Sequence, residues 1–201
     1  MEDLLQEDIY PTLELLRNAG LQIWMLTGDK VETATCIAIS AGLKSKQQDL
    51  YTIRETEDNM ELLNCLTEFG NKTDCILIID GISLNAMLKN QFNLFMQVAT
   101  SAPAVVCCRV SPTQKAEITE YVKSFTGKIV LGIGRFAVLM AGDGGNDVGM
   151  ILSANVGVGI AGKEGKQAAL ASDFSITKFK HLANLLLWHG RLSYKRCSLM
   201  S

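Results

Sequence analysis

The sequence predicts an α/β protein built on an open parallel sheet with helices on both faces. Short, continuously apolar runs such as CILIID at residues 75–80 are typical of strands buried on both faces of a parallel sheet. Segments with helical spacing of apolar residues alternate with these runs. Three runs also end in polar residues, within MLTGDK, CCRVSPTQK and LMAGDGGND. Because binding sites of such sheets collect at the carboxyl ends of the strands, these three loops are the candidate site.

The expected elements follow one another along the chain. A helix over residues 7–20 has Ile9, Leu13 and Leu16 on one face and stops at Gly20. A second helix, KVETATCIAISAG at residues 30–42, is closed by Gly42, and a polar stretch, residues 44–59, follows it. A further helix starts at Pro112, and the last helix spans residues 179–197. The expected strands cover residues 21–29, 75–80, 104–110, 128–133, 137–140 and 155–160.

Composition narrows the function classes. The 201 residues are 48% hydrophobic and 20% charged, with a net charge of −2, which is ordinary for one globular domain. The absence of a basic excess argues against nucleic acid binding. Six cysteines without a CxxC pair, with only two histidines, exclude a zinc pattern and indicate reduced thiols in a cytosolic environment. No signal peptide and no apolar run of about 20 residues is present, so we expect a soluble or peripheral chain.

The stretch MAGDGGNDVGMI, residues 140–151, holds two aspartates four residues apart. Asp143 would end a strand, and Asn146 or Asp147 would cap the following helix. Carboxylate and amide oxygens within one turn suit Mg²⁺. A plain Gly/Asp surface turn is the alternative interpretation.

Two further strand ends carry candidate phosphate ligands. Thr27, in TGDK, offers a hydroxyl at the start of a helix, where an anion is favoured, although Thr27 or Asp29 could be a simple N-cap. Lys115 lies in the first turn of the helix after Pro112, against the helix dipole, which suggests a lysine that neutralises phosphate. A solvated surface lysine would fit as well, and Arg109 has the same two interpretations.

Two other features carry less weight. GVGIAG at residues 157–162 matches GxGxxG, but Glu164 replaces the Ser or Thr of a P-loop, so a glycine-rich strand and turn is favoured. The segment KFKHLANLLLWHGRLSYKRC is basic and amphipathic. It is either a packed helix with a cationic face or a stalk that approaches the cytoplasmic side of a membrane.

In combination and in this order, the motifs resemble the phosphorylation domain of P-type ATPases, and within them the phospholipid flippases of the P4 class, ATP9/Neo1-like branch. The matching stretches are IWMLTGDKVETA, CCRVSPTQKAEI, GDGGNDVGMI, GKEGKQAALASDFSITKFKHL and HGRLSYKR. The resemblance implies a haloacid-dehalogenase-like (Rossmannoid) sheet. It assigns residues 1–189 to a partial phosphorylation domain and residues 190–201 to the start of a stalk.

The resemblance also implies roles for individual residues. Thr27 would contact the phosphoryl group, Lys115 would neutralise it, and Asp143 and Asp147 would hold Mg²⁺. The other positions that match the nucleotide and phosphate site are Gly28, Asp29, Arg109 and Asn146, with Asp147 shared. The parent enzyme would use Mg-ATP to move phospholipid through membrane helices outside this sequence. It would lie in membranes of the trans-Golgi network and endosomes with this part on the cytosolic side, whereas the isolated chain would be cytosolic.

The sequence departs from the family pattern in two places. The nucleophilic aspartate of the family's DKTGT motif has no counterpart, since Asp80 in IIDGIS lacks the residues that follow it. We therefore expect the isolated chain to turn over no ATP, and its sheet to have an unpaired edge or a central gap. Residues 135–142, RFAVLMAG, look inserted, because their removal leaves GKIVLGIGDGGNDVGM. Either KIVLGI or FAVLMA could then supply the strand before Asp143.

Two alternatives remain open from the sequence. A free-standing haloacid-dehalogenase-type phosphatase would need an N-terminal DxDxT, which residues 1–8 lack. A non-catalytic regulatory module would keep only the Mg²⁺ and phosphate pocket.

Overall fold

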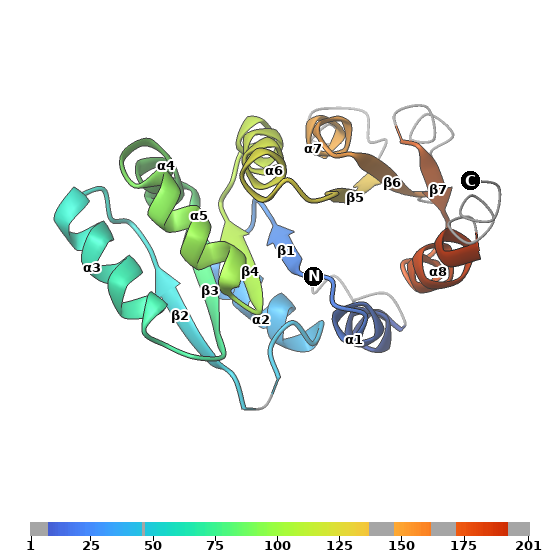
Figure 1. The fold of residues 1–201 in the computed structure, drawn as a ribbon, viewed down its shortest axis with the longest axis horizontal. Helices are drawn as coiled ribbons and strands as arrows, with labels where there is room; N and C mark the ends of the chain where they lie inside the picture. Colours follow the sequence, from blue (N-terminus) through green and yellow to red (C-terminus); the bar gives the residue numbers. More distant parts are fainter. Residues whose placement is uncertain (1–7, 46, 137–146, 162–171, 193–201) are drawn as a thin grey trace.

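The strands form two parallel sheets with helices on both faces (Figure 1). The computed structural model describes residues 8–45, 47–136, 147–161 and 172–192. The first sheet has four strands in the order β1-β4-β3-β2, and the second has three in the order β5-β6-β7. Their bounds are β1 Ile23–Leu26, β2 Asp49–Ile53, β3 Cys75–Asp80, β4 Ala104–Cys108, β5 Leu131–Phe136, β6 Val156–Ala161 and β7 Phe174–Ile176. The predicted α/β class with parallel strands is confirmed.

Helices cover the four-stranded sheet from both sides. On one face, side chains of β3 and β4 pack with α3 Asn59–Gly70, α4 Gly81–Asn90, α5 Phe92–Ser101 and α6 Pro112–Thr126. On the other, alternate residues of the same strands pack with α1 Ile9–Asn18 and α2 Val31–Ser40. Every residue of β3 and β4 is buried, as continuously apolar central strands require.

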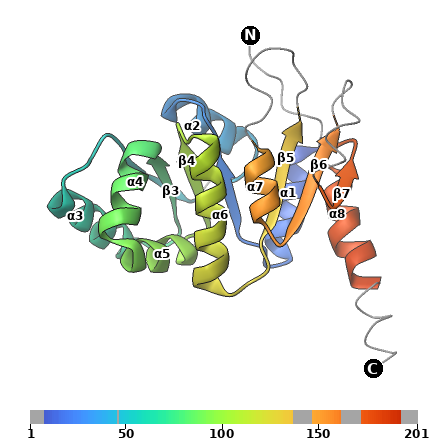
Figure 2. The same ribbon diagram turned by 90° about the horizontal axis from the view of Figure 1, so that it is seen from above.

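The three-stranded sheet has its own smaller core. Val158, Ile160 and Ile176 pack with Leu16 of α1 and with Leu182 of α8 His181–Ala183. The chain continues from α8 as a π-helix, η2 Asn184–Gly190. On the opposite face lies α7 Val148–Ser153, which contacts both β5 and α6 (Figure 2).

Apolar contacts join the two sheets on both sides. Leu13 of α1 belongs to the core under the four-stranded sheet, and Leu16, one turn later, belongs to the core of the three-stranded sheet. On the other side, Leu26 at the end of β1 packs against Met150 and Ile151 of α7. The two sheets are therefore parts of one packed structure.

The edges that face the junction are incompletely covered. In the described residues β1 pairs with β4 alone and β5 with β6 alone. All four residues of β1 are half-buried, unlike those of β3 and β4. The expected incomplete sheet is thus confirmed, and the interruption lies between β1 and β5.

The structure differs from the sequence-based assignment in several elements. β2 lies inside the stretch expected to be polar, and the sequence-based assignment contains no counterpart of α3, α4, α5 or β7. KIVLGI contributes β5, which extends through Phe136, while residues 137–140 lie outside the described residues. The last helix is confirmed in position, with its described part ending at residue 192.

Candidate functional site

Backbone hydrogen bonds join the loop after β1 to the loop after β4. Thr27 N–H donates to the Cys107 carbonyl at 2.9 Å, and Val110 N–H donates to the Thr27 carbonyl at 3.1 Å. Arg109 N–H donates to the Asp29 carbonyl at 3.0 Å. Two loops that the sequence singled out separately are therefore one structural unit at the carboxyl edge of the sheet.

The TGDK loop closes on itself. The Thr27 hydroxyl donates to Asp29 Oδ2 at 2.7 Å, and Asp29 N–H donates back to Thr27 Oγ1 at 3.1 Å. The N-cap position of α2 is Lys30, and its side chain makes no capping bond. The simple N-cap interpretation of Thr27 and Asp29 is therefore wrong. Gly28 and Asp29 are exposed, so the loop is accessible from solvent.

Lys115 is buried, so the surface-lysine interpretation is wrong. A capping box between Ser111 and Gln114, with Pro112 at the first position, starts α6 and fixes its first turn. Lys115 is only 7% exposed, and its Nζ donates to Asp147 Oδ1 at 2.8 Å. A buried ammonium group requires such a partner.

Asp147 occupies the predicted N-cap position of α7 but does not cap it. Its side chain makes no capping bond and turns to Lys115 instead. Helix α7 approaches β5 closely here, since a Cβ at Gly134 would lie 2.7 Å from the Asp147 Cβ. Only glycine at position 134 allows this packing, which holds the Asp147 carboxylate beside α6.

Part of the predicted metal site lies outside the described residues. Asp143 and Asn146 are in that part of the chain. In the ranges that the structure describes, no group of three or more His, Cys, Asp or Glu could hold a metal ion. Of the two aspartates predicted to hold the metal ion, Asp147 is the one in the described part of the chain, and Lys115 donates to one of its oxygens.

Arg109 projects from the end of β4 toward a residue that the sequence did not single out. Its Nη1 lies 3.4 Å from Glu55 Oε1, in the loop after β2. Asp80, buried at the end of β3, contacts the same loop through the Glu55 N–H. The sequence could have indicated Asp80, because this acid ends an otherwise apolar strand. Glu55 lies in a polar stretch, where nothing distinguishes it from its neighbours.

The cysteines of β4 lie directly before this site. Burial, with a smaller contribution from the Asp80 carboxylate, raises the pKa of Cys108 to about 11, and burial raises that of Cys107 well above its usual range. Cys36, Cys65, Cys75, Cys107 and Cys108 are all free thiols.

Comparison with known proteins identifies similar chains. The family described as "Phospholipid-translocating P-type ATPase C-terminal" matches residues 169–201. The "Probable phospholipid-transporting ATPase IIB" of Homo sapiens is 54% identical over 196 residues, which are 98% of this chain and 16% of that protein. "Phospholipid-transporting ATPase NEO1" of Saccharomyces cerevisiae is 52% identical over 98% of this chain and 16% of its own length.

A more distant relative extends the same pattern. "Phospholipid-transporting ATPase 2" of Arabidopsis thaliana is 41% identical over the whole chain and 18% of its own length. The chain therefore spans about a sixth of the length of these relatives. Within the described residues, no helix has the length and apolar character needed to cross a bilayer.

Proposed function

Because the chain belongs to the phospholipid-transporting P-type ATPases, we propose that it supplies the Mg²⁺- and phosphate-contacting loops of an enzyme that couples Mg-ATP hydrolysis to phospholipid translocation. The free-standing phosphatase is not favoured, since the similar chains are phospholipid-transporting ATPases. The observation that carries the proposal is the buried Lys115–Asp147 pair, 2.8 Å long, where the two sheets meet.

The residues divide the work by charge. Lys115, with its ammonium group already desolvated, would neutralise a phosphoryl group at the carboxyl edge of the strands. The Thr27 hydroxyl, which now donates to Asp29 Oδ2, would turn to the phosphoryl oxygens, and the Gly28 N–H of the same exposed loop would donate beside it. Arg109, fastened to the Asp29 carbonyl, would add a second positive charge.

Asp147 could supply one carboxylate ligand to Mg²⁺. The second oxygen, Oδ2, has no described hydrogen bond to Lys115, and Mg²⁺ is commonly held by one or two carboxylates together with substrate phosphates. Asp143 and Asn146 would complete the site, as the resemblance implies. When bound, the ion would reduce the negative charge of the phosphoryl oxygens.

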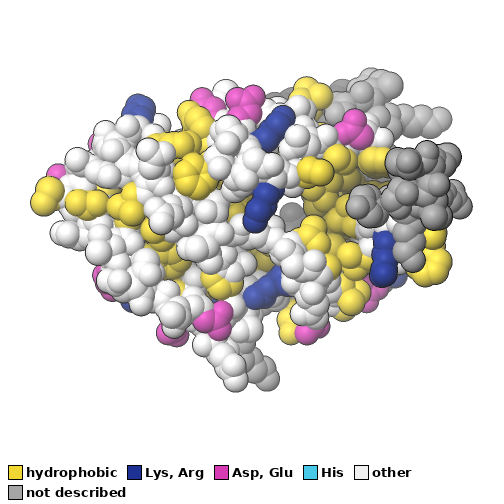
Figure 3. Space-filling view, in the orientation of Figure 1, with side chains coloured by type: hydrophobic (Ala, Val, Ile, Leu, Met, Phe, Trp, Pro, Cys, Tyr) yellow, Lys and Arg dark blue, Asp and Glu magenta, His cyan; other side chains and the backbone are white. Residues whose placement is uncertain are grey.

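The interruption between the sheets is where we place a strand that carries the DKTGT motif in a longer form of the protein. Figure 3 shows a hollow at this junction, with hydrophobic side chains on the side of the three-stranded sheet. The strands on either side of the interruption are only partly covered, since all four residues of β1 and Leu131 and Ile133 of β5 are half-buried. A parallel strand there would pair with both edges and bring its aspartate to the same carboxyl edge.

The remaining proposals rest on the resemblance. Residues 1–189 would belong to the phosphorylation domain, and residues 190–201 would begin the stalk toward the membrane. The parent enzyme would lie in trans-Golgi and endosomal membranes with this part on the cytosolic side, which imaging of the tagged full-length protein would test.

Calorimetric titration of the 201-residue chain with orthophosphate, with and without Mg²⁺, tests the site. We expect Mg²⁺-dependent binding that weakens at least tenfold in K115M and in D147N. K123M is the matched control, since Lys123 lies near the other end of the same helix, and its affinity should be unchanged. Equal affinities in K115M and K123M would refute the proposed site.

A further inference from the structure

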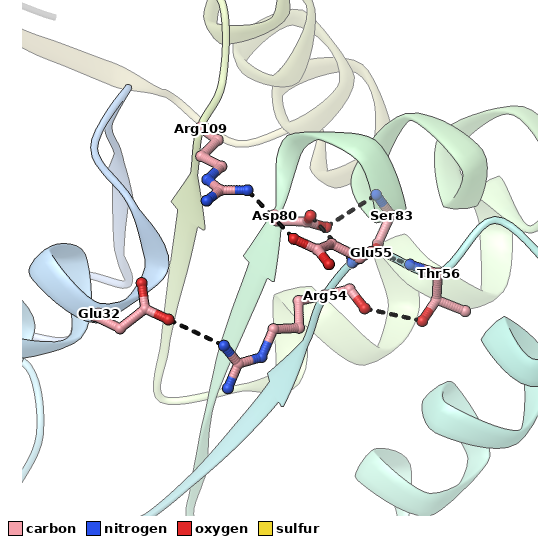
Figure 4. Close-up of polar contacts among 7 residues, drawn as sticks. All are labelled: Glu32, Arg54, Glu55, Thr56, Asp80, Ser83 and Arg109. Carbon is pink, nitrogen blue, oxygen red and sulfur yellow. Dashed lines mark hydrogen bonds and ion pairs between the residues drawn. The ribbon is translucent and has the colours of Figure 1, made fainter.

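Glu55 and Arg109 face one another across three neighbouring strand ends. Glu55 follows β2, Arg109 follows β4, and Asp80 ends β3 between them (Figure 4). Their backbones share an uncommon feature, because Glu55 has a φ of 53° and Arg109 a φ of 51°. Residues other than glycine adopt this left-handed conformation at a cost, so the surrounding contacts must hold both.

The Glu55 loop is held at three consecutive residues. Arg54 Nη1 lies 3.0 Å from Glu32 Oε1 of α2. The Glu55 N–H donates to Asp80 Oδ2 at 3.1 Å, and the Thr56 N–H donates to Ser83 Oγ at 3.0 Å. The loop is therefore anchored to α2, to the end of β3 and to the first turn of α4.

Asp80 is the buried centre of this anchor. It is 1% exposed, and its other oxygen, Oδ1, accepts from Ser83 N–H at 3.0 Å as the N-cap of α4. Both carboxylate oxygens thus have donors, as a buried carboxylate requires. One acid fixes the start of α4 and the Glu55 backbone together.

The backbone of Arg109 is fixed by contacts on both of its polar groups, while its side chain stays accessible to solvent. Its N–H donates to the Asp29 carbonyl, and its carbonyl lies against Gly81, where a Cβ would be 2.5 Å away. Its side chain is 43% exposed and borders an open cavity of about 440 Å³ that Lys89 and Gln114 also line. The guanidinium group is thus open to solvent, and its contact with Glu55 restricts its movement there.

We propose that Glu55, anchored by Asp80, is a positioning residue that orients the Arg109 guanidinium for the phosphates of a nucleotide. The role of Arg109 rests on the proposed function, whereas its orientation by Glu55 does not. Arginine has many rotamers, so restricting them before the ligand arrives reduces the entropy lost on binding. Glu55 accepts a hydrogen bond from Nη1 only, so the remaining N–H groups of the guanidinium stay available to phosphate.

Two measurements on the 201-residue chain test this proposal. The ¹⁵N heteronuclear NOE of the Arg109 Nε–Hε group reports side-chain order. We expect the NOE to fall in E55A and to recover partly in E55Q. It should also fall in D80N, because an amide NH₂ group then replaces the Asp80 oxygen that accepts from the Glu55 N–H. D58N is the matched control, because Asp58 is also an aspartate N-cap, of α3, and contacts Glu61 rather than Glu55. An unchanged NOE in E55A would overturn the proposal.

The second measurement is the affinity for Mg-ATP. We expect R109A and E55A each to weaken binding about fivefold, and the double variant to be no weaker than R109A, since Glu55 acts through Arg109. Additive losses, or tighter binding in E55A, would overturn the positioning role while leaving the proposed function intact. Absence of Mg-ATP binding by the unmodified chain, or no effect of R109A, would instead refute nucleotide binding at this site, and the proposal with it.

Discussion

Lys115 Nζ lies 2.8 Å from Asp147 Oδ1, and this pair links the helix after β4 in one sheet to the helix before β6 in the other. Its side chains are 9% and 24% exposed, which makes it the most buried of the ion pairs in the described residues. A charge pair at this depth is costly to desolvate and offers little net stability over apolar packing. Its position at the carboxyl edge of both sheets agrees with a chemical role.

Removing one partner of this pair should be more costly than removing both. K115M should lower the free energy of unfolding by about 2 kcal/mol, because Asp147 then keeps a partly buried charge without a partner. K115M/D147N should lose less than K115M alone, because no unpaired charge then remains. Urea unfolding at neutral pH measures these values. Additive losses would show that the two charges act independently.

Helix α1 should hold the two sheets together through Leu16. L16A should lower the free energy of unfolding by about 3 kcal/mol, because it leaves a cavity under the three-stranded sheet. L15A on the same helix should change it by less than about 0.5 kcal/mol, since Leu15 is 52% exposed. Hydrogen exchange should also show faster exchange in β6 for L16A than for L15A. Equal effects of the two variants would argue against this role of α1.

Deleting residues 135–142 should tighten Mg²⁺ binding. The deletion joins Gly134, which already touches Asp147, directly to Asp143. Asp143 would then directly follow the shortened β5, with Asp147 four residues later, as in the family pattern GDGGND. Calorimetry with MgCl₂ compares the two forms, and a weaker affinity of the shortened chain would contradict the account.

The buried thiols of β4 should resist alkylation. Burial keeps the pKa of Cys108 at about 11, so at pH 8 almost no thiolate is present, and the side chain is not accessible. Mass spectrometry after iodoacetamide treatment should find the exposed Cys36 modified much sooner than Cys108. Similar rates at both positions would mean that the four-stranded sheet opens readily.

The sequence predicts an element correctly where burial determines which residues it contains. The continuous apolar runs of β3 and β4 predict central parallel strands, and both are completely buried. Pro112 predicts the start of α6, because its fixed φ suits the first helical position. By contrast, β2 is an edge strand with polar residues such as Asp49 and Thr52, so its pattern resembles a loop.

The site was predictable only in part. A lysine against the helix dipole indicated that Lys115 has a special environment, but its partner Asp147, 32 residues later, became evident only from the packing of α7 on α6. Glu55 lies in a loop whose conformation depends on Asp80 and Ser83, 25 or more residues away. Long-range hydrogen bonds of this kind leave no periodic signal in a sequence.

Paramagnetic relaxation by Mn²⁺, used in place of Mg²⁺, tests the central claim that loops from both sheets form one metal and phosphate site. Substoichiometric Mn²⁺ with orthophosphate should broaden the amide signals of Thr27, Lys115 and Asp147 together, and leave that of Leu62 in α3 sharp. Broadening confined to one of these loops, or none at all, would contradict the account.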